Sequence, residues 1–181
     1  MRVRGLAAAA GAVVLLTAGP ALAEAKSQAG GPVVDLLCKG SATAKLDDHL
    51  STAPHLVRWT VDGVLTACND GLDRPAATGD GAWHEAGQEV ASCSFSDARS
   101  ATYTQKILWA NGEKSLISGT LSIDDHEAGE SLTKAEGRVV SGAYKGDNVL
   151  ETSTVMTTHP ETCEEAGLTP EEAVGTFVFS H

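Results

Sequence analysis

The sequence YTQKILWANGEKSLISGTLSI, residues 103–123, decides the fold class. Its large apolar side chains share one parity on both sides of a central Asn-Gly pair: Tyr103, Ile107, Trp109, Ile117, Leu121 and Ile123. Apolar residues at every second position predict two β-strands, each with one buried face. A two-residue loop of Asn111 and Gly112 would put the two apolar sets on opposite faces of the hairpin, whereas a three-residue loop keeps them together. We therefore predict a three-residue turn with Gly112 at positive φ.

Strand-forming segments continue along the rest of the chain. Segments rich in Thr, Val, Ser and Leu alternate with Gly, Asp, Asn and Pro at intervals of roughly 8–12 residues. The pattern predicts an all-β fold, with a single antiparallel domain of about eight strands arranged as a β-sandwich or as a barrel. Further strands are expected at residues 132–142, 148–158 and 174–179, with a loop at residues 160–172.

The segment around Trp59 alternates apolar and polar residues from Val57 to Val61, and then continues through Asp62-Gly63 to Val64 and Leu65. Two consecutive apolar residues indicate a change of phase, and a β-bulge is the usual cause of such a change. We predict a bulge at Gly63.

The N-terminal 23 residues have the features of a secretory signal peptide. Arg2 and Arg4 precede an apolar run over residues 6–18, and small residues, Ala21 and Ala23, occupy the positions that a signal peptidase requires. The run is shorter than the roughly 20 residues that span a bilayer. We expect cleavage after Ala23, a secreted extracellular protein, and no membrane insertion after cleavage.

Residues 24–34 lack periodicity and are rich in small residues, which predicts a flexible leader. Residues 35–181 are then expected to form the single secreted β-domain.

Four cysteines follow the predicted cleavage site: Cys38, Cys68, Cys93 and Cys163. An even number of cysteines in an exported chain, without a CxxC pair, indicates two disulfides rather than a zinc or redox site. Cys38 and Cys68 lie symmetrically about residues 53–54, as partners in adjacent antiparallel strands would. We predict the pairs Cys38–Cys68 and Cys93–Cys163.

The chain is acidic, with 24 Asp and Glu against 13 Lys and Arg and a formal net charge of −11. Cleavage of the signal peptide would remove two arginines and no acid. A strongly negative protein is repelled by phosphate backbones, so we expect no nucleic-acid partner. The charge is scattered along the chain, which is typical of a solubilising surface.

Several strand and turn segments resemble a group of small secreted proteins from Streptomyces-like actinobacteria. The segments are CKGSATA at 38–44, WANG at 109–112, GRVVSGAYKGD at 137–147, and Cys163 ahead of GTFVF at 175–179. The group has no established activity. The resemblance therefore implies a secreted, β-sandwich-like domain with two disulfides, and it assigns no catalytic residue.

No catalytic motif is recognisable. The chain has neither the Gly-x-Ser-x-Gly elbow of a hydrolase nor the His-Glu-x-x-His helix of a zinc protease. Its six histidines are dispersed, and we expect them at the surface. His84 and Glu85 are adjacent in a predicted strand and would point to opposite faces. We name no catalytic residue and no cofactor.

The stretch most like a calcium loop contains Asp70 and Asp73, with Asp80 following. Hard cations bind several oxygen ligands on a flexible loop, but Asp, Asn and Gly are also ordinary turn formers, and the EF-hand spacing is absent. A second acidic loop, around His126, would raise the pKa of that histidine or attract a cation, and a solvated turn is the alternative.

Trp83 and Tyr103 are the candidate ligand-binding residues. Exposed aromatic side chains stack on sugars or anchor partners, and packing in the core is the alternative for both. Trp59 and Trp109 lie in phase with apolar neighbours and are expected in the core.

These features favour a non-enzymatic extracellular binding or envelope-associated module, whose partner is an extracellular protein or an envelope component. Two alternatives stay open. One is an extracellular hydrolase with dispersed carboxylates, and the other is a secreted protease inhibitor that acts through one rigid loop.

Overall fold

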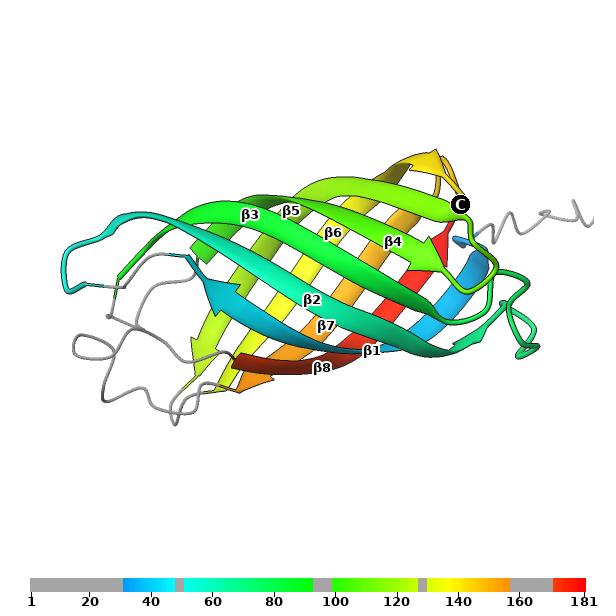
Figure 1. The fold of residues 1–181 in the computed structure, drawn as a ribbon, viewed down its shortest axis with the longest axis horizontal. Coiled ribbons are helices and arrows are strands. Elements are labelled where there is room, and N and C mark those ends of the chain that lie inside the picture. Colours follow the sequence, from blue (N-terminus) through cyan, green and yellow to red (C-terminus); the bar gives the residue numbers. More distant parts are fainter. Residues whose placement is uncertain (1–30, 48–50, 93–98, 127–129, 157–170) are drawn as a thin grey trace, which may run out of the picture. The chain divides into compact units, whose positions relative to one another are not determined.

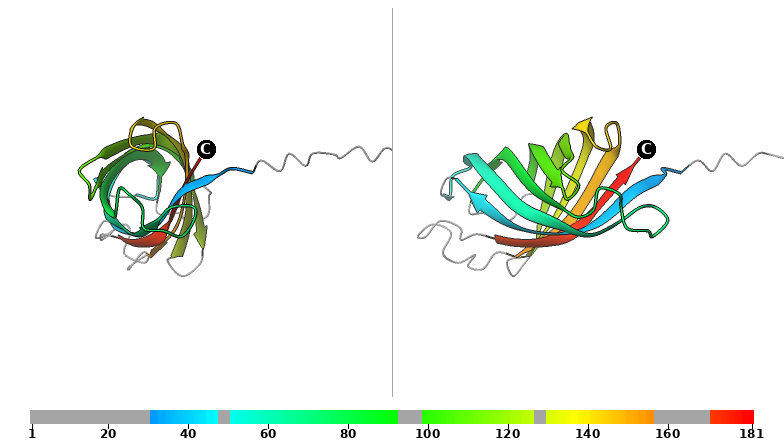
Figure 2. Two further views of the ribbon diagram at one scale, coloured as in Figure 1. Left: turned by 90° about the vertical axis from the view of Figure 1, so that its right-hand side faces the viewer. Right: turned by 45° about the vertical axis from the view of Figure 1, so that its right-hand side comes forward.

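The computed structural model describes residues 31–47, 51–92, 99–126, 130–156 and 171–181, and these form eight β-strands. In chain order they are β1 (Val34–Leu46), β2 (His55–Asn69), β3 (Gly81–Ala91), β4 (Arg99–Trp109), β5 (Lys114–His126), β6 (Glu130–Gly142), β7 (Asn148–Met156) and β8 (Glu171–Ser180). Each strand pairs antiparallel with the next one (Figure 1). Because β1 also pairs with β8, the sheet closes into a barrel, seen as a ring in the left view of Figure 2. The all-β prediction is confirmed, and the closure selects the barrel over the sandwich.

Strict alternation of side chains sets the inside and the outside of the barrel. In β4, the residues of odd number from Ala101 to Trp109 are buried, and the even-numbered residues between them are exposed. The same alternation runs through β3 from Gly81 to Ala91. Both strands therefore present one set of side chains to the interior, as expected for a small closed barrel.

The β4–β5 hairpin turns as the sequence predicts. Leu108 pairs with Lys114, and the amide of Trp109 donates to the carbonyl of Glu113, so three residues form the loop. Gly112 has a φ of 88°, which glycine adopts without steric cost. Both apolar sets consequently face the barrel interior.

The predicted strands at 132–142, 148–158 and 174–179 correspond to β6, β7 and β8. Two boundaries were wrong. Residues 171–172, predicted as loop, begin β8 because they pair with both β1 and β7, and Val34, predicted in the leader, begins β1 by pairing with Ser180. The signal peptide, residues 24–30 of the leader and residues 157–170 lie outside the described residues.

The predicted bulge at Gly63 is wrong. Gly63 pairs in unbroken register with Ala42 on β1 and with Trp83 on β3. A Cβ at this position would lie 2.6 Å from the indole nitrogen of Trp83, so the glycine makes room for that ring. The change of phase occurs further along β2, at Ala67, whose φ is 51°.

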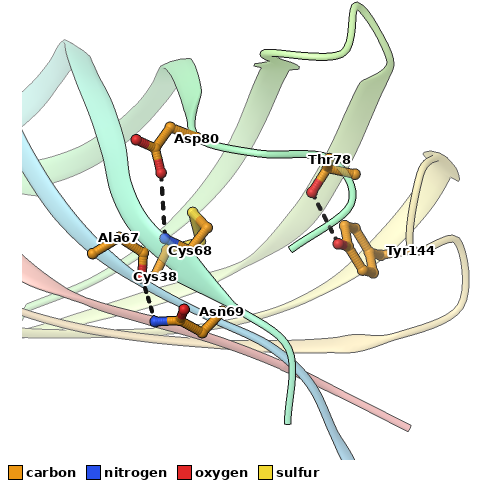
Figure 3. Close-up of a disulfide and its surroundings, with 7 residues drawn as sticks. All are labelled: Cys38, Ala67, Cys68, Asn69, Thr78, Asp80 and Tyr144. Atoms are coloured by element: carbon orange, nitrogen blue, oxygen red, sulfur yellow. Dashed lines mark hydrogen bonds between the residues drawn. A yellow bond between two sulfur atoms is a disulfide. The ribbon is translucent and has the colours of Figure 1, made fainter. Parts of the chain in front are cut away.

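This irregularity lies opposite Cys38 and turns Cys68 inward. Register shifts between Leu37 and Lys39 on β1, where two residues of β2 oppose one residue of β1. Cys38 and Cys68 are both buried and form a disulfide, which confirms the predicted pair (Figure 3). The predicted pair Cys93–Cys163 lies outside the described residues.

Aromatic side chains fill the interior near the disulfide. The rings of Trp109, Tyr144 and Phe179 pack against one another with centroids 5.5–5.9 Å apart. The indole N–H of Trp109 donates to the hydroxyl of Ser115 at 2.9 Å. Trp109 and Trp59 are both buried, as predicted. This end of the barrel is therefore packed and its central polar group is satisfied.

Candidate ligand-binding site

A polar cluster occupies the middle of the barrel interior. Glu85 on β3 and Gln105 on β4 are paired neighbours, and Glu151 projects from β7, four strands away on the opposite wall. The side-chain nitrogen of Gln105 donates to Glu85 Oε2 at 3.0 Å and to Glu151 Oε2 at 3.5 Å. One amide nitrogen thus bridges two carboxylates across the interior.

The cluster is shielded from solvent, with exposed fractions of 4% for Glu85, 0% for Gln105 and 8% for Glu151. Every lysine and arginine whose side chain the structure describes is exposed, so none of these faces the two carboxylates. A buried carboxylate without a counter-charge is strongly disfavoured in its ionised form.

Both glutamates accordingly hold their protons more tightly than usual. Burial, and then the charge of Glu151, raises the pKa of Glu85 well above its ordinary value. Burial raises the pKa of Glu151 to about 7, against the opposing effect of the hydrogen bond from Gln105. At neutral pH the pair therefore carries less than its full negative charge, and protonation of one carboxylate depends on the other.

Several polar atoms in the same interior have no hydrogen-bond partner within the described part of the chain. They are Gln105 Oε1, Tyr103 Oη, Trp83 Nε1 and Trp59 Nε1. A buried polar group without a partner costs about 1–3 kcal/mol, and buried groups of this kind are normally satisfied. The set combines hydrogen-bond donors with an acceptor, which is the composition of a ligand-binding site.

Register places these groups side by side. On β3 and β4, Trp83 lies opposite Ile107, Glu85 opposite Gln105, and Gly87 opposite Tyr103. The charges of Glu85 and Glu151 add to burial in raising the pKa of Tyr103 above its ordinary value, so the phenol lies within the field of both carboxylates. Trp59 pairs with Gly87 and covers it, since a Cβ there would meet the indole at 2.2 Å.

Both predicted ligand residues, Trp83 and Tyr103, belong to this interior. They are buried rather than exposed, so they cannot stack on an external sugar. The predicted separation of His84 and Glu85 is confirmed, because His84 is exposed and contacts Asp62 while Glu85 faces inward. Among the 24 acids, no sequence pattern distinguishes Glu151, and Glu85 stands out only by its adjacency to His84.

Two of the three candidate calcium ligands, Asp70 and Asp80, accept hydrogen bonds within the chain, and the third, Asp73, is a turn residue. Asp70 accepts hydrogen bonds from the backbone of Leu72 and from the backbone and side chain of Arg74, whose guanidinium lowers its pKa. Asp73 has a φ of 58°, which is typical of a turn. Asp80 accepts from the amide of Cys68 at 3.3 Å (Figure 3).

The histidines with described side chains lie outside the polar cluster. His84 and His181 are exposed and each pairs with an aspartate, Asp62 and Asp35 respectively. The side chain of His126 lies outside the described part of the structure, as do His49 and His159.

A separate hollow of about 730 Å³ lies against β5–β8 and is lined mainly by serine, threonine and aliphatic residues. Among the described residues of its lining, Lys134 is the one ionisable side chain, and it pairs with the carboxylate of Glu136. The described lining therefore offers no buried reactive group.

No protein-family model, curated protein or solved structure matches the chain. Among the described residues, no helix is long and apolar enough to cross a membrane.

Proposed function

We propose that the protein is a non-enzymatic extracellular binding protein that holds a small molecule inside its barrel. The observation that carries the proposal is the group of donors and acceptors around Glu85, Gln105 and Glu151 that have no hydrogen-bond partner in the described part of the chain. The predicted signal peptide and the disulfide support an extracellular location.

The chemistry of the cluster favours a ligand that carries an amine. An ammonium group would offset the negative charge that Glu85 and Glu151 share, and it would donate to the Gln105 oxygen that has no partner among the described residues. The rings of Trp83 and Tyr103 lie beside these carboxylates on the same inner face and offer a cation–π contact. An anionic ligand would be repelled at the same place.

Three probes of one shape test this selectivity: benzylamine, benzyl alcohol and benzoate. We expect saturable binding of benzylamine by calorimetry and tryptophan fluorescence, weaker binding of the alcohol, and none of benzoate. Glu85→Gln is expected to weaken benzylamine binding by about tenfold or more, whereas the exposed control Glu136→Gln leaves it unchanged. Equal affinity for benzoate and benzylamine, or no binding of any probe, would contradict the proposal.

The two buried carboxylates also support a second candidate, an extracellular hydrolase. A glycosidase uses two carboxyl groups on either side of the scissile bond, one of them with a raised pKa. Here Gln105 bridges both carboxylates, and the pKa of each is raised. Turnover of an envelope polysaccharide or peptide that is lost in Glu151→Gln would favour the hydrolase over the binding protein.

The third alternative, a protease inhibitor, depends on a rigid loop pinned by Cys163. A stoichiometric complex with a secreted serine protease, resistant to cleavage, would favour it. A binding partner that is an extracellular protein or envelope component stays a prediction and is tested by capture with the oxidised mature chain.

A further inference from the structure

A second cluster of ionisable groups lies at one rim of the barrel, apart from the interior site. Asp35 on β1, Asp147 just before β7 and His181 just after β8 each offer one ligand atom, and these atoms all lie within 4.8 Å of one another. Within the described part of the chain, this is the one such group of three or more His, Cys, Asp or Glu side chains.

Strand register brings these residues together. β8 lies between β1 and β7, and Ser180 pairs with Val34 on one side and with Asn148 on the other. His181 and Asp147 each lie one residue beyond these pairs. Asp35 sits at a register shift between Val34 and Leu36, which leaves it without a backbone pairing partner in β8. A bulge of this kind redirects a side chain, often at a functional site.

The two carboxylates of this cluster favour a positive charge between them. His181 Nδ1 lies 2.6 Å from Asp35 Oδ2, and Asp147 stands beside this pair. Asp147 is 9% exposed, and its Oδ2 has no hydrogen-bond partner among the described residues. Two carboxylates that face each other repel unless a proton or a cation lies between them.

We propose that Asp35, Asp147 and His181 bind a divalent transition-metal ion, with Zn²⁺ as its representative. A nitrogen ligand with two carboxylate oxygens suits zinc and related ions, whereas calcium and magnesium take oxygen ligands. The side chain of His181 is 64% exposed, so the ion has access from solvent and a fourth position stays open to water. This site is independent of the interior site, which lacks a histidine.

The distances are compatible with such an ion after small side-chain rotations. Ligand atoms at about 2.0–2.2 Å from a tetrahedral metal lie roughly 3.3 Å apart. The pair His181–Asp35 is already closer than this, and the third ligand atom lies no more than 4.8 Å away. Metal binding would separate the histidine from Asp35 by replacing their shared hydrogen bond.

Calorimetry with ZnCl₂ on the full mature chain, with its disulfides intact, tests the proposal. We expect one Zn²⁺ per chain at this site, and no competition from equimolar Ca²⁺. Loss of a group that supports a metal ligand weakens metal binding roughly 10–100-fold. We expect both H181A and D147N to weaken Zn²⁺ binding by at least this factor. Absorption of the Co²⁺-loaded protein should report a nitrogen ligand that is lost in H181A.

His84→Ala is the matched control, because His84 and Asp62 form an exposed pair 2.8 Å apart that no third ligand joins among the residues the structure describes. This variant should bind zinc as the unmodified protein does. Unchanged binding in H181A, equal loss in the His84 variant, or displacement of zinc by calcium would overturn the proposal. Since His181 is exposed, its variant is expected to fold, so a folding defect in D147N would not obscure the result.

Discussion

The buried carboxylate pair predicts that the protein loses stability as the pH rises from mildly acidic to neutral. In the unfolded chain Glu151 titrates near 4.5, and in the barrel burial raises its pKa to about 7. Between these values the folded state binds more protons than the unfolded state, so the free energy of unfolding falls with increasing pH. The contribution of Glu151 is fully present below pH 4.5 and is lost as the pH passes 7.

The shift from 4.5 to about 7, at about 1.4 kcal/mol per pKa unit, corresponds to roughly 3 kcal/mol. Glu85 acts in the same direction, since burial and the charge of Glu151 raise its pKa too. Replacing Glu151 by glutamine removes one titration and also lowers the pKa of Glu85. We therefore expect the variant to be more stable than the unmodified protein at pH 8, and its stability to depend less on pH.

Urea unfolding at several pH values between 4.5 and 8 measures this effect for both proteins. The exposed Glu136→Gln is the control, and its pH dependence should match that of the unmodified protein. The comparison with Glu151→Gln isolates the interior pair, because Asp147 and His181 at the rim also have raised pKa values but are unchanged in the variant. If the unmodified protein were equally stable at pH 5 and pH 8, the pair would not be desolvated and the reasoning would be refuted.

Three further variants test the packing of the barrel. Gly87→Ala would bring a methyl carbon to 2.2 Å from the indole of Trp59. We expect the free energy of unfolding in urea to fall by about 1–3 kcal/mol and the near-UV circular dichroism to weaken. Unchanged values would show that the ring does not pack against this glycine. The double variant C38A/C68A removes a crosslink between residues 30 positions apart and should lower the free energy of unfolding by about 2–4 kcal/mol. A urea midpoint equal to that of the unmodified protein would mean that strand pairing alone stabilises this end of the barrel. Ser115→Ala leaves a buried indole N–H without its acceptor and should cost about 1–3 kcal/mol, which a thermal melt that matches the unmodified protein would contradict.

Local patterns predicted the strands and their inward faces. The shared parity around Asn111-Gly112 was sufficient to fix the loop length of the β4–β5 hairpin, because one residue more or less would expose a whole apolar set. The disulfide between Cys38 and Cys68 could also be predicted from local sequence, because both cysteines lie in one hairpin. Local pattern did not predict the role of Gly63, because this glycine makes room for the Trp83 ring on the neighbouring strand.

The interior site depended on information that one strand does not contain. Gln105 shares the parity of Tyr103 and Ile107, so a polar residue in the buried face of β4 was visible in the sequence as an anomaly. Its meaning comes from closure of the barrel, which brings Glu151 from the opposite wall to the same amide nitrogen. That contact joins residues 46 positions apart, and no periodicity of either strand encodes it.

Glycines of the inner wall make room for the large aromatic rings of the interior. Large rings rest where a neighbouring strand has no Cβ, in the pairs Trp59 with Gly87, Trp83 with Gly63, and Phe177 with Gly40. Each ring is thereby held close to the wall, where overpacking would cost about 1–3 kcal/mol. The indole N–H groups of Trp59 and Trp83 have no hydrogen-bond partner among the described residues, and a ligand of the proposed kind would meet donors that are already fixed in place. Such preorganisation favours a site that recognises a polar group over a core that is only packed. Replacing one of these glycines is therefore expected to weaken both the packing and the proposed binding.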